Sequence, residues 1–324
     1  MATRKSLVPL LLAFVALLTS LCAGSGVWCS FGSKATTAAN SITADTDFRA
    51  PTSSDREIGK TLGGIGGFVK PGTTYNVYAQ ATDTGKPASG IASVTANVSS
   101  ISSGQTAAAL SSGTFSFDNV SYNRRSANLT VGSSLANGTY SYSLTLTDAS
   151  GNAKTESGYT VTVDGTAPSA SAISTTNKSG NIAGRPDIGD TVVFTFSEPP
   201  DPLTDVTSTD AVVRIDNNAT AGGNDRLQVW DGPNTTILPI GSVDLGRNDY
   251  VTASRTFGAT GTASTAVLSG SVITVTLGTQ SGAGTTAAGT GSLIWTPSNS
   301  LVDRAGNVMS TTARTETGTA DKDF

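Results

Sequence analysis

The chain of 324 residues lacks the side chains that carry out most enzyme chemistry at neutral pH. It contains no histidine, and its two cysteines, Cys22 and Cys29, both lie near the N-terminus. General acid–base catalysis most often uses histidine, so a Ser-His-Asp or Cys-His arrangement is impossible here. Zinc sites built from histidine and thiolate are excluded beyond residue 30. We therefore expect a protein that is not an enzyme and that uses no organic cofactor.

Carboxylates are the remaining groups with chemistry, and they support two interpretations. Glu198, Asp201 and Asp205 lie close together in the sequence, and two carboxylates are enough for a glycosidase. Because prolines alternate with these acids, we favour a rigid turn at the end of a strand instead. Calcium binds carboxylate, amide and backbone oxygens. Loops near the predicted domain ends offer such oxygens from Asp148, Asn152, Asp164, Glu198, Asp303 and Asn307.

These six residues have a second interpretation that needs no metal. Aspartate and asparagine side chains commonly accept hydrogen bonds from backbone N–H groups two to four residues further on and so stabilise their own turns. The sequence leaves both open. Calcium is the one metal that fits the chain, and its sites would lie at the domain ends.

The elements that must position these loops are strands. In the segment Thr139–Thr147, tyrosines and leucines alternate strictly with serines and threonines, a period of two that predicts a half-buried strand. Its first aromatic residue, Tyr140, follows Leu135-Ala-Asn-Gly, which predicts a tyrosine corner whose hydroxyl returns to the backbone upstream. Similar short alternating segments continue to residue 296. No segment beyond the N-terminal apolar run has helical periodicity, so the expected fold class is all-β.

The N-terminus predicts a bacterial secretion signal over residues 1–30. Arg4 and Lys5 precede the apolar run Leu7–Leu21, which is followed by small residues. We expect a helical signal segment, an extracellular or cell-surface location, and membrane contact only through this segment if it stays uncleaved. The following residues resemble bacterial proteins with a SipW-type signal peptide, such as TasA and camelysin. The resemblance is carried by Trp28, Phe31, Asn40, Ile42, Ala44, Asp45 and Thr46.

Two further resemblances concern the rest of the chain. The motifs Leu-x-x-Gly-x-Tyr at 135–140, Asp-x-x-Gly-Asn at 148–152 and Val-Asp-x-Thr-Ala-Pro at 163–168 resemble bacterial immunoglobulin-like repeats of cell-surface proteins and adhesins. Phe-Ser-Glu-Pro at 196–199 and Asp-x-Ala-Gly-Asn at 303–307 resemble a second bacterial immunoglobulin-like class. These resemblances imply two tandem immunoglobulin-like β-sandwich domains. In adhesins similar to the first unit, aspartates at the junction bind calcium and stiffen the string of domains.

The expected organisation is a signal peptide over 1–30, an extended segment or linker over 31–70, and domains over 71–167 and 168–324, the second with long loops. The preferred function is a structural or adhesive protein whose partners are surface or matrix proteins or polysaccharide. One alternative is a matrix fibre subunit in which Phe31–Phe48 adds as a strand to a neighbouring copy. Another is a carbohydrate-binding module that stacks sugars on Trp230 or Tyr250. A formal charge of −4 gives no footprint for nucleic acid.

Overall fold

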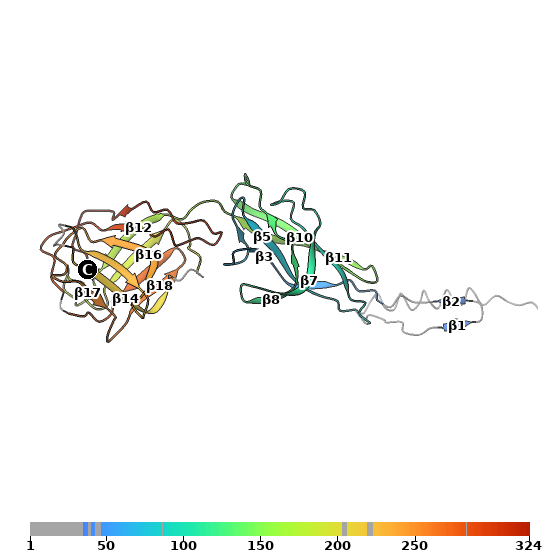
Figure 1. The fold of residues 1–324 in the computed structure, drawn as a ribbon, viewed down its shortest axis with the longest axis horizontal. Coiled ribbons are helices and arrows are strands. Elements are labelled where there is room, and N and C mark those ends of the chain that lie inside the picture. Colours follow the sequence, from blue (N-terminus) through green and yellow to red (C-terminus); the bar gives the residue numbers. More distant parts are fainter. Residues whose placement is uncertain are drawn as a thin grey trace, which may run out of the picture.

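The computed structural model describes residues 35–37, 40–42, 47–85, 87–202, 206–218, 223–282 and 284–324. The described part of the chain contains strands, turns and loops and no helix, which confirms the all-β class. None of its elements is a helix long and apolar enough to cross a membrane. The expected signal helix and both cysteines lie outside the described residues. Two bodies of strands lie end to end along the long axis (Figure 1).

The first domain, residues 47–163, is built on one nine-stranded sheet with the order β3-β5-β8-β7-β6-β10-β11-β4, in which β9 also pairs with β5. Strand β7 joins its two halves, because its first residues pair with β6 and the remainder pairs with β8. The sheet therefore curls into a barrel-like body around a main core, and Tyr78, Phe117 and Tyr122 form a smaller separate cluster. Its strands are β3 (Thr52–Lys60), β4 (Phe68–Val69), β5 (Thr74–Thr82), β6 (Ile91–Asn97), β7 (Ala108–Phe117), β8 (Val120–Ser126), β9 (Leu129–Thr130), β10 (Gly138–Asp148) and β11 (Ala153–Val163).

The second domain, residues 169–324 after a linking peptide at 164–168, repeats this plan with a ten-stranded sheet of order β12-β13-β19-β18-β14-β15-β16-β20-β21, in which β17 also pairs with β14. Strand β14 is the joint, pairing with β18 at its start and with β15 and β17 further on. The strands are β12 (Ala170–Thr176), β13 (Thr191–Phe196), β14 (Ser208–Asp216), β15 (Arg226–Trp230), β16 (Ile237–Asp244), β17 (Arg255–Phe257), β18 (Ser264–Ser269), β19 (Val272–Thr276), β20 (Ile294–Thr296) and β21 (Arg314–Thr315). A separate pair is formed by β1 (Ala35–Thr37) and β2 (Asn40–Ile42).

Each domain buries its own hydrophobic core, as the alternating sequence pattern requires. Strand β10 buries Tyr142, Leu144 and Leu146 on one face, which confirms the prediction for this segment. The core of the second domain centres on Trp295, which two phenylalanines of β13 contact edge to face. The indole N–H of Trp295 donates to the carbonyl of Ile240 at 2.9 Å, so its polar atom is satisfied within the core.

The first domain begins earlier than the sequence indicated. Residues 31–70 were expected to be an extended segment or linker, but β3 and β4 lie within this range and belong to the sheet. Strand β3 pairs with β5 over its whole length and buries Ile58 completely. It was missed because it is mostly polar and carries no alternation of apolar residues. Its pairing partner, rather than its own pattern, makes it a strand.

Candidate metal centre at the domain junction

Three carboxylates from distant parts of the chain meet where the two domains join. Asp164 follows β11 directly, Glu198 comes two residues after β13, and Asp303 lies in the loop after β20. Each offers one oxygen that lies within 4.8 Å of an oxygen of the other two. The sequence named all three as candidate calcium ligands, and the structure brings them together. This site is called the junction cluster below.

Asp303 and Asn307 are held in a tight turn by their own motif. The backbone N–H of Asn307 donates to Asp303 Oδ1 at 2.8 Å, and its side-chain Nδ2 donates to Asp303 Oδ2 at 2.7 Å. Nδ2 also donates to the backbone carbonyl of Asp164 at 3.0 Å. Asn307 therefore ties the last loop of the second domain to the peptide that links the domains.

Asp164 is held from the first domain by Asn137. Asn137 Nδ2 donates to Asp164 Oδ1 at 2.8 Å, and Asn137 Oδ1 accepts from the backbone N–H of Gly165 at 2.8 Å. The loop that carries Asn137 is fixed by Tyr140, whose hydroxyl donates to the carbonyl of Ala136 at 2.9 Å. This hydrogen bond is the tyrosine corner that the sequence predicted. The ring of Tyr140 is half-buried against the core rather than fully buried.

Two oxygens at the junction cluster have no hydrogen-bond donor. They are Oε1 of Glu198 and Oδ1 of Asn307, and both atoms are buried. Asn307 is only 1% exposed, so its amide oxygen cannot be satisfied by bulk water. Buried polar atoms normally find a partner, and one left without costs about 1–3 kcal/mol. A cation that takes oxygen ligands is one kind of partner that such atoms can have.

The electrostatics of the junction cluster also favour a positive charge. Burial raises the pKa of Glu198 to about 7, and a hydrogen bond with Asp164 and repulsion from Asp164 and Asp303 add to the rise. Ionised carboxylates this close repel one another. Either a proton or a bound cation relieves the repulsion, and the oxygen donor set is the one that calcium prefers.

The other two residues expected to bind calcium, Asp148 and Asn152, lie at the opposite end of the first domain. There they form the same turn as Asp303 and Asn307, with hydrogen bonds of 2.8 and 2.7 Å from Asn152 to Asp148. Asp148 forms a second carboxylate group with Asp47 and Asp83. The oxygens of these aspartates accept hydrogen bonds from nearby N–H and hydroxyl groups, so this group stabilises its own loops.

Sequence reasoning missed Asp47 and Asp83, although the signal for one of them is present. The segment Asp-Phe-Arg-Ala-Pro at 47–51 repeats Asp-Gly-Thr-Ala-Pro at 164–168. In both places the backbone carbonyl of the aspartate accepts a hydrogen bond from the asparagine of the Asp-x-x-Gly-Asn turn. Each domain thus carries the same pair of motifs, one before its first strand and one in a loop before its last strand.

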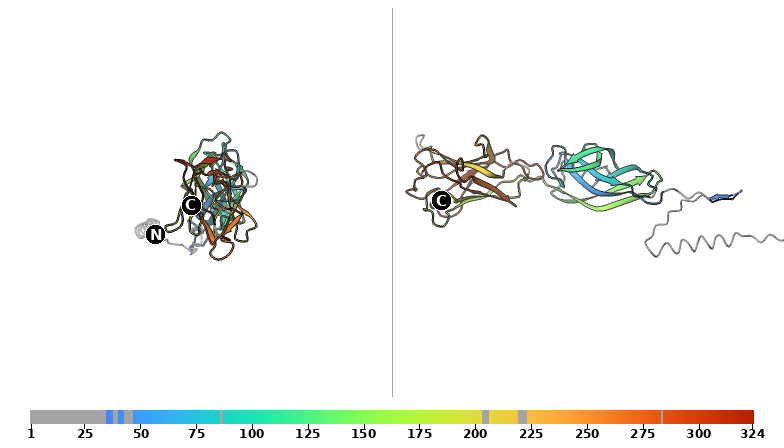
Figure 2. Two further views of the ribbon diagram at one scale, coloured as in Figure 1. Left: turned by 90° about the vertical axis from the view of Figure 1, so that its left-hand side faces the viewer. Right: turned by 90° about the horizontal axis from the view of Figure 1, so that it is seen from below.

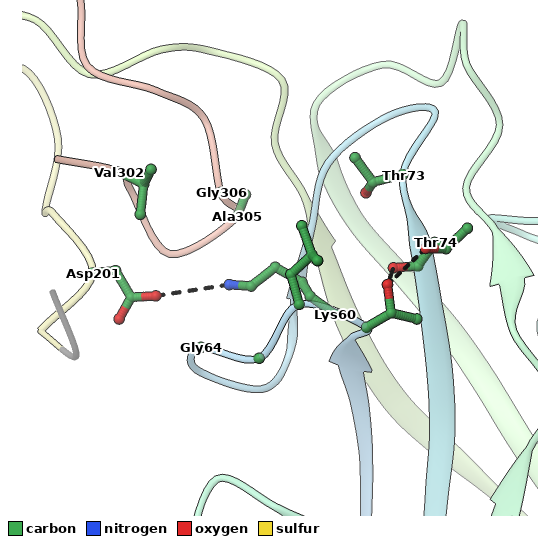
Figure 3. A pocket seen from close by; sticks show the side chains of 11 residues that line it. Lys60, Gly64, Thr73, Thr74, Asp201, Val302, Ala305 and Gly306 are labelled. Carbon is green, nitrogen blue, oxygen red and sulfur yellow. Dashed lines mark hydrogen bonds and ion pairs between the residues drawn. The ribbon is translucent and has the colours of Figure 1, made fainter. Parts of the chain in front are cut away.

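A lysine provides a second contact across the junction. Lys60, the last residue of β3, extends from the first domain into the second (Figure 3). Its ammonium donates to the backbone carbonyl of Arg304 and lies 3.8 Å from Asp201 Oδ2. Burial lowers the pKa of Lys60, while Asp201 and Asp303 oppose the change. Asp201 is thus part of an interdomain contact, and Asp205 lies outside the described residues.

The two aromatic residues proposed as sugar platforms have different environments, and one prediction was wrong. Tyr250 is fully buried, exchanges hydrogen bonds with Asp323 at 3.1 Å and packs edge to face on Phe324. It has no face for a ligand, because the loops of the second domain close over it. Trp230 is half-buried, and the guanidinium carbon of Arg214 lies 3.6 Å from the ring centroid. One face of that ring is therefore covered.

Comparisons with known proteins do not assign the chain to a family. No family model matches it, and no curated protein matches it. Among solved structures, it is similar to the Bacteroides ovatus mixed-linkage glucan utilization locus SGBP-B in complex with a mixed-linkage heptasaccharide. The identity is 13%, the match covers 77% of this chain and 42% of that chain, and the TM-score is 0.16. The chain thus spans less than half of that protein, and a likeness this weak carries no argument about fold or function.

Proposed function

We propose that the protein is a non-catalytic, secreted structural or adhesive protein of the bacterial cell surface, whose two β-domains are held in line by a calcium ion at the junction cluster. The N-terminal sequence supports secretion, and the tandem β-domains support a spacer or adhesive role. The observation that carries the proposal is the pair of donor-less buried oxygens beside three carboxylates. Its partners would be surface or matrix proteins or polysaccharide.

The proposed ion has a mechanical role that follows from where its ligands lie. Asp164 belongs to the peptide between the domains, while Glu198 and Asp303 belong to loops of the second domain. Asn137 of the first domain holds Asp164 in place. An ion bound to all three carboxylates would fix the linking peptide to the second domain and narrow the range of interdomain angles. The contact of Lys60 with the second domain lies on another part of the same junction and also restricts the interdomain angle.

Calcium titration of the folded protein tests this proposal. An ion that binds only the folded state stabilises it by RT ln(1 + [L]/Kd), about 1.4 kcal/mol for ~1 mM calcium at a ~0.1 mM site. We expect a higher melting temperature with calcium and a narrower distribution of interdomain angles in small-angle scattering. Glu198→Gln should abolish both effects.

Asp83→Asn is the matched control, because Asp83 belongs to the carboxylate group whose oxygens are already satisfied. It should leave the calcium response unchanged. A response that Asp83→Asn removes and Glu198→Gln does not would place the ion elsewhere. Equal melting temperatures with calcium and with chelator would refute the proposal.

A further inference from the structure

The two domains present the same structural motif at corresponding ends. We call the entry pole the end at which a domain's first strand begins, and the exit pole the opposite end. Each entry pole combines an Asp-x-x-Ala-Pro segment with an Asp-x-x-Gly-Asn turn, at 47–51 and 148–152 in the first domain and at 164–168 and 303–307 in the second. The hydrogen bonds within the two turns agree in donor, acceptor and length.

The junction between the two domains shows which groups contact an entry pole of this kind. The exit pole of the first domain rests on the entry pole of the second, and Lys60 reaches the carbonyl of Arg304 within the Asp-x-x-Gly-Asn turn. Beside it lie Leu62, Gly63 and Gly64 of the first domain and Val302, Ala305 and Gly306 of the second, which line a common cleft (Figure 3). The contact therefore combines one lysine with a turn carbonyl and the carboxylate of Asp201, beside small residues, while Leu62 at its edge stays fully exposed.

The exit pole of the second domain carries the same elements, and they face solvent. Lys178 lies fourteen residues after Asp164, as Lys60 lies thirteen residues after Asp47. Lys178 is exposed, and no ion pair holds its ammonium among the described residues. Ile182 and Ile188 in the same loop are 47% and 41% exposed. Because the two domains lie end to end, the exit pole of the second domain and the entry pole of the first are at opposite ends of the molecule (Figure 2).

The entry pole of the first domain offers the complementary surface. Ala149 occupies the position that Arg304 has in the second domain, and it is exposed. Phe48 in the Asp-x-x-Ala-Pro segment is 63% exposed. Of the carboxylate group formed by Asp47, Asp83 and Asp148, only Asp83 is partly exposed, and the exposed Arg49 lies in the same segment. Lys178 at the other end carries an exposed positive charge. Packing of the exposed apolar side chains at the two poles against one another would remove apolar surface from water, which is favourable.

We propose that the exit pole of the second domain docks on the entry pole of the first domain in another copy of this chain. Lys178 takes the role that Lys60 has within the chain, against the Ala149 carbonyl and the carboxylate of Asp83, and Ile182 and Ile188 pack on Phe48. Because the two surfaces differ, the contact is heterologous and repeats head to tail into an open filament. This contact is independent of the calcium ion proposed at the junction cluster.

Sedimentation velocity of the mature protein over a range of concentrations tests the docking. We expect concentration-dependent oligomers that weaken at high salt, because screening reduces the attraction of Lys178 for the carboxylate of Asp83. Lys178→Glu disables the exit pole and Phe48→Asp disables the entry pole. Each should lower the association constant about tenfold or more. Mixed in equal amounts, the two variants should form a dimer that does not grow, because each still has one intact pole.

Two variants on the sides of the second domain serve as controls. Val267→Asp places a charge at a residue that is 53% exposed on β18, and Arg226→Glu reverses an exposed charge on β15. Both should associate as the parent does. A monomer at every concentration would overturn the proposal. Oligomers that Lys178→Glu and Phe48→Asp leave unchanged would also overturn it and would favour strand addition by the N-terminal segment. Samples without calcium should associate to the same extent as samples with calcium. The outcome of this test is therefore independent of whether calcium binds at the junction cluster.

Discussion

The second domain should become more stable as the pH falls from 7.5 to 5, because of one buried carboxyl group. Asp323 is fully buried, and burial raises its pKa from 3.8 to about 7, with repulsion from Glu316 adding to the rise. Thr175 and Tyr250 donate hydrogen bonds of 3.1 Å to its two oxygens. The folded state therefore holds a proton on Asp323 in a pH range where the unfolded chain has lost it.

The sign and size of the effect follow from proton linkage. The pKa of Asp323 is higher in the folded protein than in the unfolded chain. Its proton therefore stabilises the folded state fully below about pH 4, and this stabilisation is lost as the pH rises through about 7. Each pH unit in this interval is worth about 1.4 kcal/mol, so the change from pH 7 to pH 5 amounts to roughly 2.5 kcal/mol. Glu198 contributes in the same direction, so the parent protein alone does not isolate Asp323.

Urea unfolding at pH 7.5 and pH 5, on the parent and on Asp323→Asn, separates the two contributions. The asparagine cannot ionise, so the variant should lose the part of the increase in unfolding free energy that Asp323 contributes, roughly 2.5 kcal/mol, and keep the part that Glu198 contributes. Glu198→Gln should lose only its own part and keep that of Asp323. If Asp323→Asn retains the full pH dependence of the parent, Asp323 is ionised in the folded state at neutral pH and the reasoning fails.

Three further substitutions have defined outcomes. Tyr140→Phe should cost ~1 kcal/mol of unfolding free energy by loss of the hydrogen bond to Ala136, and Tyr140→Ala several times more; equal costs would deny the tyrosine corner. Gly241→Ala should cost about 3 kcal/mol or more, measured by thermal unfolding, because its φ is +104° and a Cβ would lie 2.2 Å from the Thr296 carbonyl oxygen. Lys60→Met should weaken the interaction between the two domains by about 1–3 kcal/mol. In calorimetry, the unfolding transitions of the two domains should then lie further apart than in the parent.

The sequence predicted the elements that carry their own pattern. Strand β10 was recognised because tyrosine and leucine alternate with serine and threonine along its whole length, and burial of every second residue follows. Strand β3 was not, because Thr52–Lys60 is polar and becomes a strand only through β5. The tyrosine corner was readable because its hydrogen bond is local. Immunoglobulin-like topology remains a prediction, since in each domain one strand joins both halves of a barrel-like sheet.

The candidate site was predicted in its residues but not in its arrangement. The two Asp-x-x-Gly-Asn turns look alike in sequence, yet only the one at 303–307 meets the peptide between the domains. Asp47 was overlooked because it lies within the segment 31–70 that was taken for a linker. Tyr250 was offered as a sugar platform because a lone aromatic in a loop carries no sign of tertiary burial. Which loops meet at one end of a sheet depends on strand order, which short motifs do not encode.

Anomalous diffraction from crystals grown with calcium tests the central claim most directly. The account predicts one anomalous peak at the junction cluster, within bonding distance of Asp164, Glu198 and Asp303, with the amide oxygen of Asn307 turned toward it. It predicts no peak at the group formed by Asp47, Asp83 and Asp148, whose oxygens are already satisfied. A junction without a peak at saturating calcium, or a peak at the first domain's group alone, would contradict it.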